Sequence, residues 1–195
     1  MNAILPIVEG DGDARAVPIL VRRILESKGI YIQVLAANKR GDLPKIRGSF
    51  ENYFRAAIKF KAPILWVLDF DCDDCNCQKE EAEKLYKRAN DIYENWPFKV
   101  VFISKEFEAL FLAEKNTART VLGIDDSFEF PANPNSIRGA KGVLSHALPK
   151  GRAYKETVHQ QKIAAQIDLD ILREVSSDFR HLEKSVLFLA NHHCN

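Results

Sequence analysis

The chain has 195 residues, a formal net charge of +1, 46% hydrophobic residues and 28% charged residues. Because so many aliphatic and aromatic side chains can offset the entropy of ordering, this composition excludes intrinsic disorder, and the length is typical of one domain. No stretch approaches the roughly 20 consecutive apolar residues that cross a bilayer, so no membrane partner is expected. The start of the chain lacks the basic flank of a signal peptide, which predicts a cytoplasmic protein with reduced cysteines.

In the first half of the chain, short apolar runs alternate with helical patterns. Strands are expected over residues 3–8, 30–36, 64–68 and 98–103, and helices over residues 14–27, 49–60 and 78–95. Ser49 is the expected N-cap of the second helix. This alternation is typical of βαβ units and predicts an α/β fold with a mostly parallel sheet, covered by helices on both faces.

The second half of the chain has a different pattern. Helices are expected near residues 141–148, 157–166 and 177–190, after a loop over residues 125–138 that contains two prolines. We therefore expect an α/β core over residues 1–125 and a mostly helical C-terminal extension over residues 126–195 that packs on the core.

Acidic side chains follow two of the predicted strands. Glu9 ends the first strand, and Asp69, Asp71 and Asp73 follow the third. In open α/β sheets ligands bind at the carboxyl ends of the strands, and the two-residue period can aim Asp69 and Asp71 the same way. Carboxylates brought together repel one another and favour a hard cation such as Mg²⁺. The alternative is that these acids are solvated loop residues and helix caps.

The order of these motifs resembles the TOPRIM fold. Residues 7–13, Ile-Val-Glu-Gly-Asp-Gly-Asp before a helix, look like its Glu motif, and residues 67–71, Val-Leu-Asp-Phe-Asp, look like its Asp-x-Asp motif. The resemblance covers residues 3–104 and is strongest to small bacterial TOPRIM-like proteins with an OLD-nuclease-like domain, often encoded beside an ABC/AAA-type ATPase. Several such pairs act in defence against phage. A Glu-x-Glu segment at residues 105–113 resembles a further element of that group.

The resemblance implies roles for individual residues. Glu9 would act as general acid/base or as a metal ligand, and Asp69 and Asp71 would hold Mg²⁺, with Asp73 as a looser candidate. Glu106 and Glu108 would complete a second metal site, so that two ions stabilise the attacking and leaving oxygens of a phosphodiester. The alternative for Glu106 and Glu108 is that they are first-turn acids stabilised by the helix dipole.

Basic residues supply candidates for phosphate binding. They are Lys39, Arg40, Lys45 and Arg47 in the first half, and Arg138, Lys141, Lys150, Arg152, Lys155 and Arg180 in the second. Lys141 opens a predicted helix, where backbone N–H groups favour a phosphate, and in the resemblance it would neutralise the scissile phosphate. The alternative is that these are solvated charges balanced by nearby acids.

The cysteines allow a different hypothesis. Cys72, Cys75 and Cys77 are closely spaced, and the chain ends with His192, His193 and Cys194. These residues would form a zinc site if the C-terminus folded back onto the loop after the third strand, although the spacing is not that of a common zinc ribbon. The alternative is that a loop tolerates cysteines in a reducing compartment.

Together, the residues and the resemblance predict a Mg²⁺-dependent nuclease, with Mn²⁺ as a possible substitute, that cleaves phosphodiester bonds in DNA or RNA, including transfer RNA. The predicted role is that of an effector in an anti-phage pair with an ATPase, as a monomer or a homo-oligomer. Two alternatives stay open, a catalytically inactive module that docks an ATPase or nucleic acid and a zinc-organised interaction domain. No Gly-rich nucleotide-binding motif is present, so ATP hydrolysis by the chain itself is not expected.

Overall fold

A five-stranded parallel sheet forms the centre of the protein, as a computed structural model that describes residues 3–71 and 77–192 shows. Its strands are β1 (Ala3–Val8), β2 (Gln33–Val34), β3 (Asn38–Lys39), β4 (Ile64–Phe70) and β5 (Phe98–Ser104). The order across the sheet is β2-β1-β4-β5, and β3 also pairs with β1. Each of these pairings is parallel, so the carboxyl ends of β1, β3, β4 and β5 meet at one edge.

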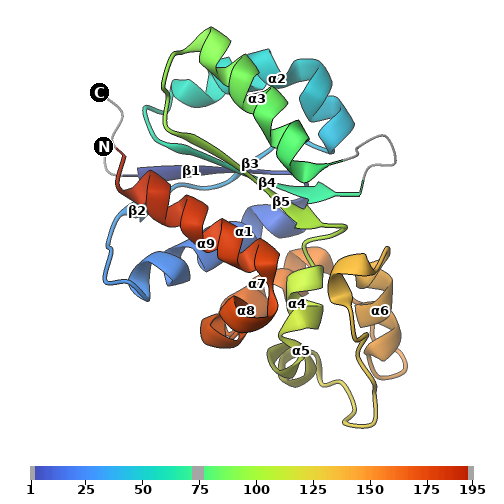
Figure 1. The fold of residues 1–195 in the computed structure, drawn as a ribbon. Coiled ribbons are helices and arrows are strands. Elements are labelled where there is room, and N and C mark those ends of the chain that lie inside the picture. The colour runs from blue at the N-terminus through green and yellow to red at the C-terminus, as the bar shows by residue number, and fades with distance from the viewer. Residues whose placement is uncertain (1–2, 72–76, 193–195) are drawn as a thin grey trace.

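Helices cover both faces of the sheet. They are α1 (Asp11–Glu26), α2 (Leu43–Ile58), α3 (Gln78–Ile92), α4 (Ala109–Ala113), α5 (Lys115–Leu122), α6 (Ala140–Ala147), α7 (Glu156–Ala164), α8 (Leu169–Val175) and α9 (Ser177–Ala190), with a short 3₁₀ helix at Pro134–Ser136. Figure 1 shows α2 and α3 above the sheet, α1 and α9 below it, and α4, α5 and α6 grouped below the carboxyl end of β5. No helix in residues 3–71 and 77–192 is long and apolar enough to cross a membrane.

The hydrophobic core has two parts, one on each face of the sheet. Along β4, Leu65 and Val67 pack toward α1 and α9, while Trp66 packs toward α2 and α3. This alternation explains the continuous apolar run of β4, since a strand covered on both faces buries every side chain. Phe179 and Leu182 of α9 belong to the same buried cluster as α1, so the C-terminal helices help to cover this face. The division of the chain near residue 125 stays a prediction.

Most of the expected elements are present, and two local predictions are wrong. Residues 30–36 do not form a continuous strand. Within this range only Gln33–Val34 pairs with β1, the next pairing segment is Asn38–Lys39, and Tyr31 is exposed to solvent. Ser49 is not the N-cap of α2. The helix starts earlier, where Asp42 accepts a hydrogen bond from the backbone N–H of Lys45 at 3.2 Å, and Ser49 lies instead at a kink with φ −126°. The sequence pattern does not predict the helices α5 and α8.

The helices α1 and α7 approach each other closely at Gly12. A Cβ atom at this position would lie 2.4 Å from Oε1 of Gln160 and 2.8 Å from Cβ of Glu156, and Gln160 is fully buried. We expect Gly12→Ala to lower the free energy of unfolding by about 1–3 kcal/mol, because overpacking outweighs the roughly 1 kcal/mol gain in helix propensity. Chemical denaturation measures this change.

The matched control for this substitution is Gly142→Ala in α6, where a Cβ atom would meet nothing within 4 Å. There the same change is expected to raise stability by about 0.4–1 kcal/mol, since alanine restricts the unfolded chain and adds no clash. Equal effects at the two positions would contradict the tight α1–α7 contact.

Candidate active site at the carboxyl edge of the sheet

Four acidic side chains gather where the strands end. Glu9 follows β1, Asp13 lies in the first turn of α1, Asp69 lies near the end of β4, and Glu108 immediately precedes α4. Burial is the largest cause of the raised pKa of Asp69, and the negative charges of Asp13, Glu9 and Glu108 raise it further, so the four groups lie near enough to interact and are hereafter called the carboxylate cluster. A hydrogen bond joins two of them directly, because the backbone N–H of Asp69 donates to Oε1 of Glu9 at 3.1 Å.

Burial and mutual repulsion disfavour ionisation in the carboxylate cluster. Burial, with a further contribution from Asp13, raises the pKa of Glu9 to about 8. Burial likewise raises the pKa of Glu108 to about 7 and the pKa of Asp69 well above its ordinary value. Because each charged form lacks both water and sufficient positive charge, the cluster has a deficit of cationic partners.

Glu108 shows this deficit at the level of a single atom. Its side chain is fully buried, and Oε1 accepts a hydrogen bond from Nε2 of Gln160 in α7 at 2.8 Å. The other oxygen, Oε2, has no partner in hydrogen-bond geometry among the described residues, although the hydroxyl of Tyr154, also unpartnered, lies beside this carboxylate and interacts with it. Burial is the largest cause of the raised pKa of Tyr154, and the negative charge of Glu108 raises that pKa further. A buried carboxylate oxygen without a partner is costly unless a ligand satisfies it.

Lys141 brings positive charge to the carboxylate cluster from α6. Burial alone would lower its pKa, but the negative charges of Glu108, Glu156 and Asp69 raise it above the ordinary value for lysine. The ammonium Nζ lies 3.4 Å from Oε1 of Glu156 in α7. Lys141 is therefore a firmly charged group at the border of the site, within reach of solvent.

Glu106 holds Lys141 in place through the backbone. Its two carboxylate oxygens accept hydrogen bonds from the N–H groups of Gly139, at 3.1 Å, and of Lys141, at 3.0 Å. Gly139 has φ 80°, a left-handed conformation that favours glycine at this turn into α6. As positioned here, Glu106 caps the start of α6 rather than facing the carboxylate cluster.

The other predicted site residues lie outside the cluster or outside the described residues. Asp71 pairs with Nε of Arg138 at 2.9 Å and with Nζ of Lys105 at 3.4 Å. Asp73 lies outside the described residues, as do Cys72, Cys75 and Cys194 of the zinc hypothesis. Cys77 is exposed to solvent.

Sequence reasoning missed two members of the site. Asp13 was part of the Glu motif, but its position in the first turn of α1 also suits a helix cap, and it does accept a hydrogen bond from the N–H of Gly10 at 3.0 Å. Gln160 lies in a helix about 150 residues from Glu9, and no local pattern marks it. Only the packing of α7 on α1 brings its amide to Glu108.

The residues fit a hard divalent cation. Among residues 3–71 and 77–192, no three acidic, histidine or cysteine side chains are arranged as a ready-made chelate. Mg²⁺ does not require one, since it commonly binds one or two carboxylates and completes its shell with water and substrate phosphate. An all-oxygen donor set, raised carboxyl pKa values and the unpartnered Oε2 of Glu108 all favour such an ion.

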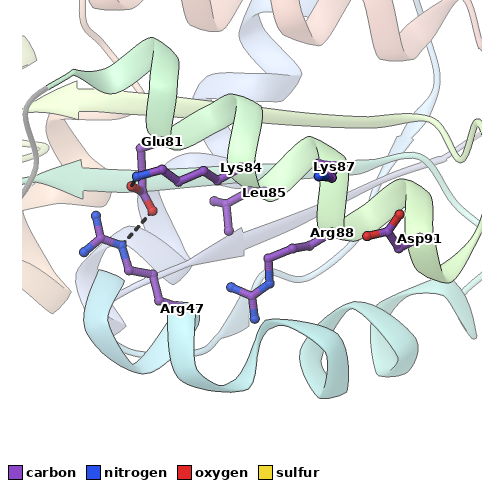
Figure 2. Close-up of a pocket in the computed structure, with 7 residues that line it drawn as sticks. All are labelled: Arg47, Glu81, Lys84, Leu85, Lys87, Arg88 and Asp91. Atoms are coloured by element: carbon purple, nitrogen blue, oxygen red, sulfur yellow. Dashed lines mark hydrogen bonds and ion pairs between the residues drawn. The ribbon is translucent and has the colours of Figure 1, made fainter.

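A pocket of about 560 Å³ between α2 and α3 offers a different chemistry (Figure 2). Its arginines are already engaged: Arg47 pairs with Glu81 at 2.6 Å, and Arg88 forms two hydrogen bonds to Glu51 while lying over the ring of Phe50. These contacts link α2 to α3. The pocket also lies on the face opposite α1, so we do not place the active site there.

Comparison with known proteins agrees with the fold. Residues 8–187 match the family described as "Domain of unknown function (DUF4276)". The C-terminal region of the Burkholderia pseudomallei OLD protein aligns with 96% of this chain and 98% of its own, at a TM-score of 0.50 and 16% identity. The C-terminal region of the Xanthomonas campestris pv. campestris OLD protein gives a TM-score of 0.44 at 12% identity, covering 98% of both chains. No curated protein matches the chain. The first of these structures confirms the predicted fold, that of the OLD C-terminal region.

Proposed function

Because the chain belongs to the DUF4276 family and has the fold of the OLD C-terminal region, we propose that it is a Mg²⁺-dependent nuclease that hydrolyses phosphodiester bonds. The observation that carries the proposal is the carboxylate cluster, which lies where ligands bind in open α/β sheets. Partly buried acids with raised pKa values beside a charged lysine are common at functional sites.

Glu9, Asp69 and Glu108 are the residues proposed to hold the cation, with Asp71 as an outer ligand at the same edge. When bound, Mg²⁺ would polarise a phosphoryl oxygen and lower the pKa of a water molecule. The remaining acids that the resemblance implies, Asp73 and Glu106, stay predictions. Mn²⁺ has the same preference for oxygen ligands and is proposed as a substitute.

The residues of the chain supply the other requirements of hydrolysis. In the metal-free site Glu9 has a pKa of about 8, so it must release a proton to bind the cation; when it stays outside the shell of the cation, that pKa suits a general acid or base near neutral pH. Lys141 can neutralise a non-bridging oxygen of the phosphate, and Glu106 fixes the turn that presents it. Glu108 is fully buried and Asp69 is half-buried, so water has limited access to these carboxylates and their electrostatic interactions are stronger than in solvent.

Two observations favour a second candidate, a catalytically inactive module that docks an ATPase or nucleic acid. Asp71 is already paired with Arg138 and Lys105, and Lys141 already neutralises part of the cluster. In that case the protein would bind Mg²⁺ or nucleic acid without turnover.

Four further proposals are supported by the sequence resemblance. They are the pairing with an ABC/AAA-type ATPase, the role in phage defence, the cytoplasmic location and self-association.

The test of the proposed function is a cleavage assay on pooled transfer RNA, single-stranded DNA and supercoiled plasmid. Each substrate is incubated with Mg²⁺, with Mn²⁺ or with EDTA. We expect cleavage of at least one substrate with either metal and none with EDTA. Metal binding without cleavage of any substrate would favour the docking module.

Replacing Lys141 should affect the cleavage rate and Mg²⁺ binding in opposite directions. We expect Lys141→Gln to reduce the cleavage rate about 100-fold or more, because a positive charge near the phosphate is lost. The same change should tighten Mg²⁺ binding, since an ammonium no longer competes for the carboxylates. Single-turnover kinetics and calorimetry measure the two effects, with Lys87→Gln, an exposed lysine of α3, as control. An unchanged rate with weaker metal binding would contradict this role.

A further inference from the structure

A basic groove of about 620 Å³ lies between α5, α7 and the loop that precedes α7. Arg152, Lys155 and Lys162 supply its positive charge, and Val121 and Val158 contribute apolar surface. No acidic side chain is among the described residues that line it. The groove is thus positively charged around a partly apolar surface, a combination that suits a polyanion with apolar parts.

The positive charges of the basic groove are not balanced within the described part of the chain. None of Arg152, Lys155 and Lys162 forms an ion pair with a described residue, in contrast to the arginines between α2 and α3. Lys155 and Lys162 both act on His159, whose pKa is lowered first by burial and then by these charges. Bringing like charges together has a cost that a bound polyanion would relieve.

The helix α7 connects the basic groove to the carboxylate cluster. Two residues of α7 that lie one turn apart contact the candidate active site: Glu156 pairs with Lys141, and Gln160 donates a hydrogen bond to Glu108. Val158, His159 and Lys162 of the same helix line the groove. Tyr154, which precedes Lys155, contacts both the carboxylate cluster and the basic groove. It lies beside the Glu108 carboxylate, and its ring stacks on His159 of the groove at a centroid distance of 5.4 Å.

We propose that the basic groove binds the sugar–phosphate backbone of one nucleic-acid strand, next to the bond that the carboxylate cluster would cleave. The inference rests on the proposed function, since it assigns a binding subsite to the substrate of that reaction. Three cations would contact phosphates, and the apolar surface would contact riboses or bases. Such contacts hold the strand in register without reading its sequence, so the groove would contribute affinity rather than specificity.

The experiment measures binding in the absence of cleavage. Fluorescence anisotropy of a labelled 20-nucleotide DNA or RNA strand is recorded with EDTA at several salt concentrations. The test protein carries Arg152→Gln, Lys155→Gln and Lys162→Gln. The control carries Lys79→Gln, Lys84→Gln and Lys87→Gln, three exposed lysines of α3 with the same total change of charge. Circular dichroism checks that both variants are folded.

We expect the groove variant to bind about tenfold or more weakly, and its slope of log affinity against log salt to fall by about 2, or roughly 0.7 for each lost phosphate contact on a single strand. The α3 control should bind like the wild type. Equal weakening of the two variants would overturn the inference, as would no binding by the wild type. It would also be overturned if polyglutamate displaced the strand as effectively as unlabelled nucleic acid does, since that would indicate an acidic protein as occupant. Specific binding without cleavage in Mg²⁺ would instead support the groove and contradict the nuclease.

Discussion

Asp69→Asn is expected to abolish metal-dependent cleavage, with a loss of about 10³-fold or more, equivalent to about 4 kcal/mol of transition-state stabilisation. Asp69 is the centre of the carboxylate cluster, since Glu9, Asp13 and Glu108 all act on its pKa. Asparagine keeps the shape of the side chain but removes the charge that would hold the cation. Initial cleavage rates at saturating Mg²⁺ measure the effect.

The same substitution should not unfold the protein. In the metal-free state burial and the neighbouring acids disfavour the ionised form of Asp69, so a neutral amide is expected to raise the free energy of unfolding at pH 8. The matched control is Asp91→Asn, an exposed position on α3, which should change neither property. Undiminished cleavage by Asp69→Asn would remove the cluster from the mechanism, and a marked loss of stability would show that Asp69 is mainly structural.

The stability of the metal-free protein is expected to fall as the pH rises from 5 to 8. The folded-state pKa values of Glu9, about 8, and Glu108, about 7, lie above the ordinary value of 4.5. The folded protein therefore binds more protons than the unfolded chain in this range. The resulting stability is fully present below pH 4.5 and is lost as the pH passes through the folded-state values. A loss of about 3 kcal/mol corresponds to a decrease in Tm on the order of 10 °C.

Mg²⁺ should reverse this loss, because it binds the ionised carboxylates and stabilises the folded state by about 2.7 kcal/mol at a concentration 100 times its Kd. Thermal unfolding in EDTA and in Mg²⁺ at several pH values measures both effects. Glu9→Gln is the control variant, since it removes one titrating group and should flatten the profile. A Tm in EDTA that stays constant from pH 5 to 8 would show that these carboxyl groups are ordinary solvated acids.

The positions of Glu9 and Asp69 could be predicted from sequence because they depend on local rules. A buried parallel strand is a continuous apolar run, and the residue that ends it lies at the carboxyl edge of the sheet. The register of β1 with β4, which pairs Val8 with Val67, then brings the two acids together. These features need no knowledge of the rest of the chain.

Features that depend on distant contacts could not be predicted in this way. The two-residue alternation suggests that Asp69 and Asp71 point the same way, yet Asp69 belongs to the carboxylate cluster and Asp71 pairs with Arg138 and Lys105. Glu106 accepts hydrogen bonds from the turn into α6, about 35 residues later in the chain. Gln160 reaches Glu108 only because α7 packs on α1.

Calorimetric titration of metal-free protein with Mg²⁺ at pH 7 tests most directly whether the carboxylate cluster is a divalent-metal centre. Wild-type protein is expected to bind the ion saturably and to release protons, seen as a binding enthalpy that depends on the buffer, because carboxyl groups with pKa values of about 7 and 8 must ionise. Asp69→Asn should lose this binding, and Asp91→Asn should retain it. Binding of equal strength by the wild type and Asp69→Asn, or no binding by either, would contradict the assignment.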